Sequence, residues 1–146
     1  MTKSWLAVIV VSAIALLGYG RYDPAYSDAP TSATAASDAL FASAFEKRTS
    51  NIDVEGQGTV EKLLPDDSDG SRHQRFIVRL NSGQTVLIAH NIDLAPRVAP
   101  LNEGDVVSFR GVYEWNEKGG VVHWTHRDPD GRRSSGWIKH NGKIFR

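Results

Sequence analysis

From Asn51 onward the chain consists of short runs of alternating apolar and polar residues separated by turn sequences, and this pattern constrains the fold most strongly. In the run 72–80 (RHQRFIVRL), every second residue is apolar: Phe76, Val78 and Leu80. The positions between them, on the opposite face, hold Arg75, Ile77 and Arg79. A period of two is typical of β-strands that bury one face. The sequence therefore predicts a mainly β domain.

Five strands are expected, and residues typical of turns lie between them. They cover residues 54–64, 72–80, 85–90, 106–115 and 121–126. Gly56 and Gly58 indicate a strong bend in the first strand. This order predicts a small five-stranded OB-like barrel, with an SH3-like barrel as the alternative that periodicity does not distinguish. Asn141-Gly142 predicts one more hairpin in the tail.

The first 20 residues predict a segment that enters a membrane, because 5–17 are apolar apart from Ser12 and follow Lys3. A cleaved signal peptide and an uncleaved signal anchor, a transmembrane helix over 5–20, are the two alternatives. The anchor is slightly favoured, because Gly18-Tyr19-Gly20 is a poor cleavage site. In both cases the rest of the chain is expected in the cell envelope. It would be anchored to the inner membrane and face the periplasm, or be secreted to the periplasm.

Residues 21–37 have the composition of a flexible linker, rich in Ala, Ser, Thr, Pro and Asp. A short helix is expected over 38–48 with Ser37 as its cap. Its apolar stripe, which we expect to pack onto the domain, comprises Leu40, Phe41, Ala44 and Phe45. The folded domain is therefore predicted to span 38–146.

Composition excludes several classes of site. The chain has no cysteine, which rules out disulfides, thiolate metal sites and a cysteine nucleophile. Its 17 Lys and Arg balance 17 Asp and Glu, so no specific nucleic-acid binding is predicted. The charge is uneven, however: residues 127–146 hold six basic and two acidic residues, and residues 53–70 hold six acidic and one basic. The basic tail would meet an anionic partner or pair with the acidic segment, and the sequence leaves both open.

The first functional hypothesis is a non-enzymatic binding module for an oligomeric or anionic ligand. OB-like folds bind ligands on the outer face of the second and third strands and on neighbouring loops. The candidate ligand-binding residues are Arg75, Arg79 and Leu87 on that face, and Trp137, Arg132 and Lys139 in the tail.

The second hypothesis is a metal-dependent hydrolase or nuclease. No cofactor is predicted outright, because no HExxH, GxSxG or P-loop sequence occurs. A zinc or other divalent metal site is the alternative, since His is the strongest available ligand. Its candidate ligands are His73, His90, His123 and His126, with Asp66, Asp67 or Asp69.

Three stretches resemble a bacterial family of small proteins known only as a domain of unknown function. Two of them are GSRHQRF at 70–76 and HNIDLAPR at 90–97. The third runs from Glu114-Trp115-Asn116 through HWTH at 123–126 to Asp128-Pro129 and Gly131-Arg132. The resemblance covers about residues 51–145. It implies a bacterial envelope-type protein with no established activity, and it carries over no catalytic residue.

Overall fold

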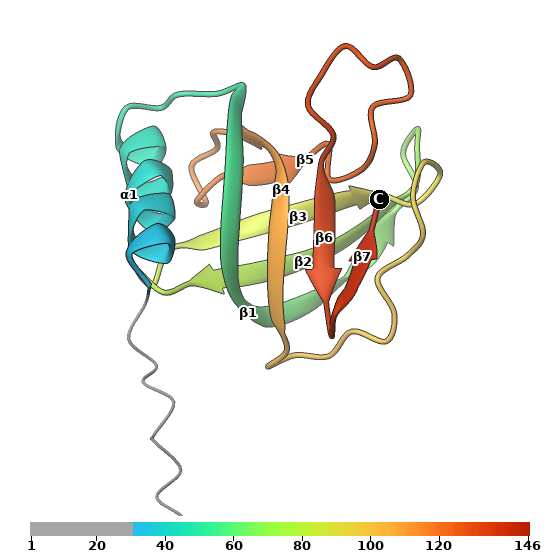
Figure 1. Ribbon diagram of the computed structural model, residues 1–146, viewed down its shortest axis with the longest axis horizontal. Helices are drawn as coiled ribbons and strands as arrows, with labels where there is room; N and C mark the ends of the chain where they lie inside the picture. The colour runs from blue at the N-terminus through green and yellow to red at the C-terminus, as the bar shows by residue number, and fades with distance from the viewer. Residues whose placement is uncertain (1–30) are drawn as a thin grey trace, which may run out of the picture.

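The computed structural model describes residues 31–146 and shows a mainly β domain with one helix, α1 (Ser32–Glu46), as predicted (Figure 1). Seven strands follow the helix: β1 (Ile52–Asp67), β2 (His73–Leu80), β3 (Thr85–Asn91), β4 (Val106–Glu114), β5 (Val121–His123), β6 (Trp137–His140) and β7 (Lys143–Phe145). Between 31 and 146, no helix has the length and apolar character needed to cross a membrane. The membrane segment predicted at 1–20 lies outside the described residues.

Five of the strands form a closed ring in the order β1-β2-β3-β5-β4, because β1 pairs with both β2 and β4. All neighbours in the ring are antiparallel except β3 and β5, which are parallel. The order and the parallel pair fit the OB-like prediction rather than the SH3-like alternative. The predicted tail hairpin is β6–β7, which extends the sheet from β4 beyond the ring.

A bend in β1 allows the ring to close. The part of β1 up to Thr59 pairs with β4, and the part from Gly58 onward pairs with β2. A Cβ atom on Gly58 would lie 2.3 Å from the carbonyl oxygen of Arg79, so only glycine permits this approach. The register shifts between Val60 and Lys62, where β1 has an irregularity. Beyond this point β1 runs past β4 and has β2 as its only strand partner among the described residues.

Helix α1 begins at Ser32, not at Asp38 as predicted. Thr31 caps it, accepting a hydrogen bond from the Thr34 amide at 3.3 Å, and the alanines of the first turns favour the helical backbone. Ser37, predicted as the cap, donates instead to the Glu55 carbonyl oxygen. Residues 32–37 therefore belong to the helix, although their composition predicts a linker.

One side of the ring is closed by α1. Phe41 is fully buried and meets Phe109 and Tyr113 edge to face, with ring centroids 6.1 and 5.7 Å away. Gly56 allows this contact, because a Cβ there would lie 2.8 Å from the Phe109 ring. Ala44 is also buried, which confirms the predicted packing of the helix onto the domain, although Leu40 and Phe45 of the predicted stripe are exposed.

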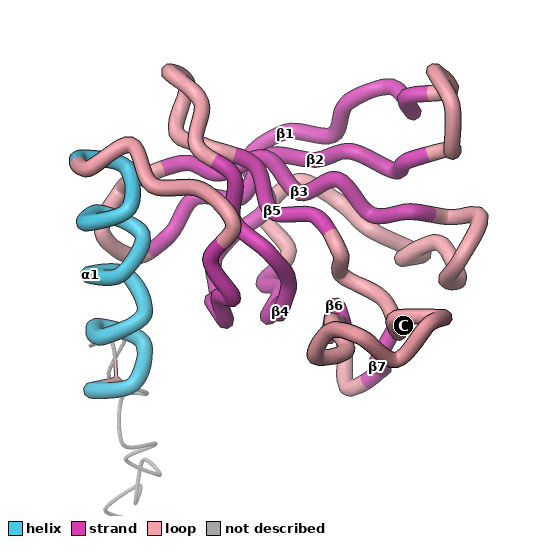
Figure 2. The backbone as a smooth tube through the Cα atoms, turned by 90° about the horizontal axis from the view of Figure 1, so that it is seen from above, coloured by secondary structure: helices cyan, strands magenta, loops and turns pink. Residues whose placement is uncertain are grey.

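The connection between β3 and β4, residues 92–105, closes the opposite side of the ring (Figures 1 and 2). It contributes Ala95 and Val98 to the buried residues, and Leu101 packs against the core. This connection contains no helix, in agreement with the limit that its prolines set.

The strand β5 ends at His123, so the expected strand over 121–126 was wrong beyond that point. Trp124 has φ +56°, a left-handed conformation that interrupts a strand. The alternation of a β-strand therefore does not continue from His123 to His126.

Candidate ligand-binding face

The outer face of β2 and β3 brings three of the predicted binding residues together. Arg75 and Arg79 lie on this face of β2 with Ile77 between them. Ile77 pairs with Leu87 of β3, and Leu87 pairs with Val121 of β5. These three apolar side chains are half-buried and form a row across three strands, which we call the apolar row.

The two arginines on this face differ in their partners. Arg79 forms an ion pair with Glu61 at 2.7 Å. Arg75 donates from Nε to the Pro65 carbonyl oxygen at 3.0 Å. Among residues 31–146, no carboxylate lies within ion-pair distance of Arg75. Arg75 is therefore a positive charge on this face without a direct ion-pair partner in the described domain, although its charge contributes to lowering the pKa of the nearby Asp66 carboxyl.

A cavity of about 240 Å³ lies next to Arg75, between the end of β1 and the β3–β4 connection. Its lining is mostly apolar and consists of Leu63, Leu64, Gln74, Arg75, Arg97, Val98, Ala99 and Leu101. Leu63 pairs with the inward-facing Phe76, yet it is 41% exposed, because β4 does not cover this part of β1. The cavity therefore combines exposed aliphatic surface with two arginines.

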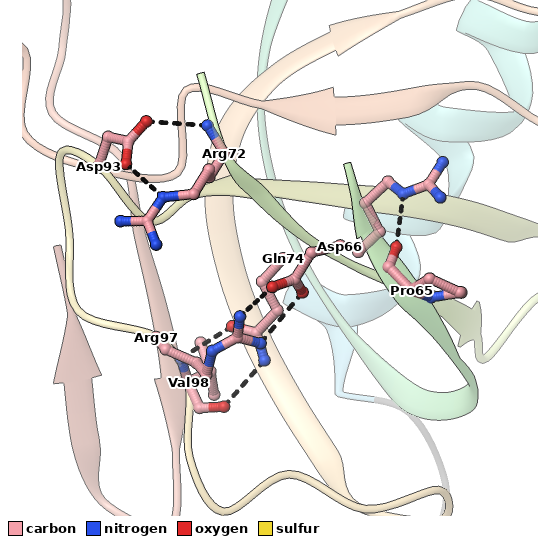
Figure 3. Close-up of polar contacts among 8 residues, drawn as sticks. Pro65, Asp66, Arg72, Gln74, Asp93, Arg97 and Val98 are labelled. Atoms are coloured by element: carbon pink, nitrogen blue, oxygen red, sulfur yellow. Dashed lines mark hydrogen bonds and ion pairs between the residues drawn. The ribbon is translucent and has the colours of Figure 1, made fainter. Parts of the chain in front are cut away.

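Polar contacts fix the walls of this cavity (Figure 3). The Gln74 side chain donates to the Val98 carbonyl oxygen and accepts from the Val98 amide, both at 2.9 Å. Arg97 holds Asp66 with two hydrogen bonds, one of them 3.1 Å long. The bonds from Arg97 lower the pKa of the Asp66 carboxyl, so it stays ionised to a lower pH than an unpaired aspartate.

A second pair anchors the start of the β3–β4 connection. Asp93 accepts from the Arg72 amide and from Arg72 Nε, both at 2.8 Å (Figure 3). These bonds lower the pKa of the Asp93 carboxyl. Arg97 and Asp93, which the sequence hypothesis did not single out as site residues, thus hold the connection to the first two strands.

Of the four histidines predicted as metal ligands, His90 is fully buried and uses both ring nitrogens. Its Nε2 donates to the Pro96 carbonyl oxygen at 2.9 Å, which leaves Nδ1 of the neutral ring to accept from the Thr125 hydroxyl at 2.8 Å. Burial lowers the pKa of this imidazole, so the neutral form is favoured.

The other three histidines have separate local partners. His73 donates to the Ser71 carbonyl oxygen at 2.8 Å, and His126 donates to the Arg127 carbonyl oxygen at 2.7 Å. His123 Nε2 lies 3.5 Å from Glu114 without a hydrogen bond. In the part of the chain that the structure describes, no three His, Asp or Glu side chains are grouped to hold a metal ion. Of the carboxylates proposed beside them, Asp67 accepts from the Asp69 amide and Asp66 pairs with Arg97.

The remaining predicted binding residues lie elsewhere. Trp137 and Lys139 belong to β6 and pair with Arg110 and Ser108 of β4, away from the β2–β3 face. Trp137 is half-buried. Arg132, in the β5–β6 connection, pairs with the nearby Asp130. Within 31–146, no ion pair joins the basic tail to the acidic segment 53–70.

The sequence was compared with known proteins. No curated protein matches it. A family match covers residues 24–146, which includes the whole ring, the cavity and the three stretches that carry the resemblance described above. The chain therefore belongs to the family described as Protein of unknown function (DUF3465).

Proposed function

We propose that this domain is a non-enzymatic binding module that holds an anionic, oligomeric ligand on the outer face of β2 and β3. The observation that carries the proposal is Arg75, a charge that forms no direct ion pair in the described domain and that lies one position along the face from the apolar row. A buried or half-buried arginine without a counterion favours the binding of an anion.

The rest of the face supports an extended ligand. The apolar row, Ile77, Leu87 and Val121, offers contact surface across three strands. Lys62 pairs with Ile77 and adds a second positive charge at one end of the row. OB-type domains use the corresponding strands to bind oligonucleotides and oligosaccharides. The zero net charge of the chain argues for an anion other than nucleic acid.

The site of action belongs to the same proposal. The apolar segment at 5–20 supports a location in the cell envelope, either anchored to the inner membrane or secreted to the periplasm. A ligand available there, such as an anionic polymer of the envelope, would be the natural partner.

The test is direct binding of polyphosphate to the full-length protein in nanodiscs of zwitterionic lipid. We expect Arg75→Gln to weaken binding about tenfold, because one charge-assisted contact is lost. Arg110→Gln is the matched control, since Arg110 is also half-buried, points outward from a ring strand and lacks a described ion-pair partner. Equal weakening in both variants would show that the polymer is held only by general attraction between charges, without a specific site at Arg75. No binding at all to this polymer or to a sulfated oligosaccharide would overturn the proposal.

A further inference from the structure

The cavity beside Arg75 is an apolar hollow with room for a small organic group. Its volume is about 240 Å³, and an apolar cavity of about 150 Å³ in another protein binds benzene. Five of its eight lining residues are aliphatic. A group that enters it would remove the exposed part of Leu63 from water, and burial of apolar surface is the main favourable term in such binding.

The cavity is also formed in advance. Both polar ends of the Gln74 side chain are bonded to Val98, so this wall is fixed and its polar groups are already satisfied. Arg97 is held by Asp66. A ligand therefore meets a rigid apolar wall and loses little free energy in ordering the protein.

The charges around the cavity select the sign of the ligand. Arg75 and Arg97 both line it and no acidic residue does. Asp66 already pairs with Arg97, and Glu103 accepts from the Leu63 amide at 3.3 Å, so Arg75 is the lining charge that is open to an anion. Arg75 also faces the apolar row, so one guanidinium group borders the cavity and the outer face of β2. An anionic group held at Arg75 would thus place a neighbouring substituent at the cavity.

We infer that the ligand is an anionic amphiphile, with a short aliphatic group beside a phosphate or carboxylate, and that the cavity receives the aliphatic group while Arg75 binds the oxyanion. This inference rests on the binding function proposed above and narrows its ligand class. The shared chemistry occurs in soluble alkyl phosphates and at the head of anionic lipids.

The first experiment is a chain-length series. Methyl, butyl and hexyl phosphate are titrated against the full-length protein in zwitterionic nanodiscs. We expect the affinity to rise about threefold to fourfold for each added methylene and then to level off when the cavity is full. This series needs no variant and so does not depend on whether a variant folds. Affinity that does not depend on chain length would overturn the inference, and polyphosphate binding through Arg75 would still support the proposed function.

The second experiment removes the apolar wall. Leu63→Ser is expected to abolish most of the gain from methyl to hexyl phosphate and to leave polyphosphate binding unchanged. Ile144→Ser is the matched control, because Ile144 is an exposed aliphatic residue on β7 that does not line the cavity. An equal loss in both variants would contradict the inference. If neither the alkyl phosphates nor polyphosphate bind, or if Arg75→Gln changes the affinity for neither of them, the inference and the proposed function are overturned together.

The third experiment separates the two sources of the amphiphile. The protein is mixed with vesicles that contain an anionic phospholipid, or with purely zwitterionic vesicles. If the protein binds the anionic vesicles and Leu63→Ser weakens that binding, the source is a lipid. If the protein binds hexyl phosphate but not the vesicles, the source is a soluble molecule. If Leu63→Ser does not weaken vesicle binding and the affinity for alkyl phosphates does not depend on chain length, the interaction depends on surface charge alone. That result would overturn the inference.

Discussion

The ring is closed on two sides, and the two closures rely on different contacts. On the α1 side, Phe41 packs against two aromatic rings, and the buried Asp38 of the same helix accepts a hydrogen bond from the Ser82 amide at 2.7 Å. On the other side, the β3–β4 connection is held mainly by hydrogen bonds from Gln74 and His90. Hollows lie beside both closures, of about 240 and 300 Å³ next to α1 and of about 240 Å³ next to the connection, but basic side chains line only the last of these three.

The difference assigns separate roles to the two sides. Close aromatic packing contributes stability, and the hollows beside α1 have no basic side chain in their linings to hold an anion. Hydrogen bonds hold a connection at fixed distances, so they can keep a hollow open where apolar packing would fill it. We therefore expect the helix side to govern the stability of the domain and the β3–β4 side to govern its binding.

The largest effect is expected from Phe41→Ala. Removal of this buried ring leaves a cavity among Phe109, Tyr113 and Gly56, and such changes cost about 3–5 kcal/mol of unfolding free energy. Urea denaturation followed by tryptophan fluorescence measures the loss. Leu40→Ala, at an exposed position of the same helix, is the control. If the protein that remains folded binds hexyl phosphate more weakly, the two sides are not independent.

Gln74→Leu is expected to destabilise the opposite side by about 1–3 kcal/mol, because the amide and carbonyl of Val98 lose their partners. The β3–β4 connection should also exchange its amide hydrogens faster, which mass spectrometry detects. Gln57→Leu is the control, since Gln57 is exposed and bonds only to Ser108 among the described residues. Unchanged exchange at Val98 would show that apolar contacts alone hold this connection.

The stability of the domain is expected to fall as the pH drops below about 6.5, the ordinary pKa of histidine. Burial lowers the pKa of His90, so below pH 6.5 the unfolded chain takes up a proton that the folded domain does not. The loss continues until the pH reaches the folded pKa, at up to about 1.4 kcal/mol per pH unit. Burial shifts the pKa of His123 in the same direction.

Thermal melts of the wild type and His90→Gln at pH 8, 7, 6 and 5 check this expectation. The variant should be less stable at pH 8, because it lacks the bonds to Thr125 and Pro96, and should depend less on pH. A variant with the pH dependence of the wild type would show that His90 does not set it.

The smallest effect is expected from Asp66→Asn. The pair with Arg97 is exposed, and such pairs contribute at most about 1 kcal/mol. Loss of the carboxylate leaves Arg97 without its described counterion, so hexyl phosphate should bind more tightly. Isothermal titration calorimetry measures the change, and Asp130→Asn, which breaks the exposed pair with Arg132, is the control. Weaker binding would mean that Asp66 is needed to position Arg97.

Much of the fold follows from local sequence, and the site does so only in part. The alternation at 72–80 and the turn residues were enough to predict the strands and to place Arg75, Arg79 and Leu87 on one face. The cavity was not predictable, because it depends on Leu63, Gln74 and Leu101, which meet only after the ring has closed.

Three other differences between the prediction and the structure have identifiable causes. The six residues before Asp38 read as a linker because of their Ser, Thr and Ala content, but the alanines and the Thr31 cap support a helix. The fifth strand was predicted to be too long, because nothing in its composition indicates the left-handed backbone at Trp124. Arg97 was part of the HNIDLAPR stretch, but its bond to Asp66 joins residues far apart in the chain.

The closure of β1 onto β4 also bears on how the chain folds. Residues 52–59 find their partners only at 106–113, and Phe41 finds its partners at Phe109 and Tyr113. Contacts of such long sequence separation form slowly, after the loop between them has been brought together. During synthesis the early strands have no complete core until β4 and β5 have been made. We therefore expect the domain to fold only after most of the chain has been made.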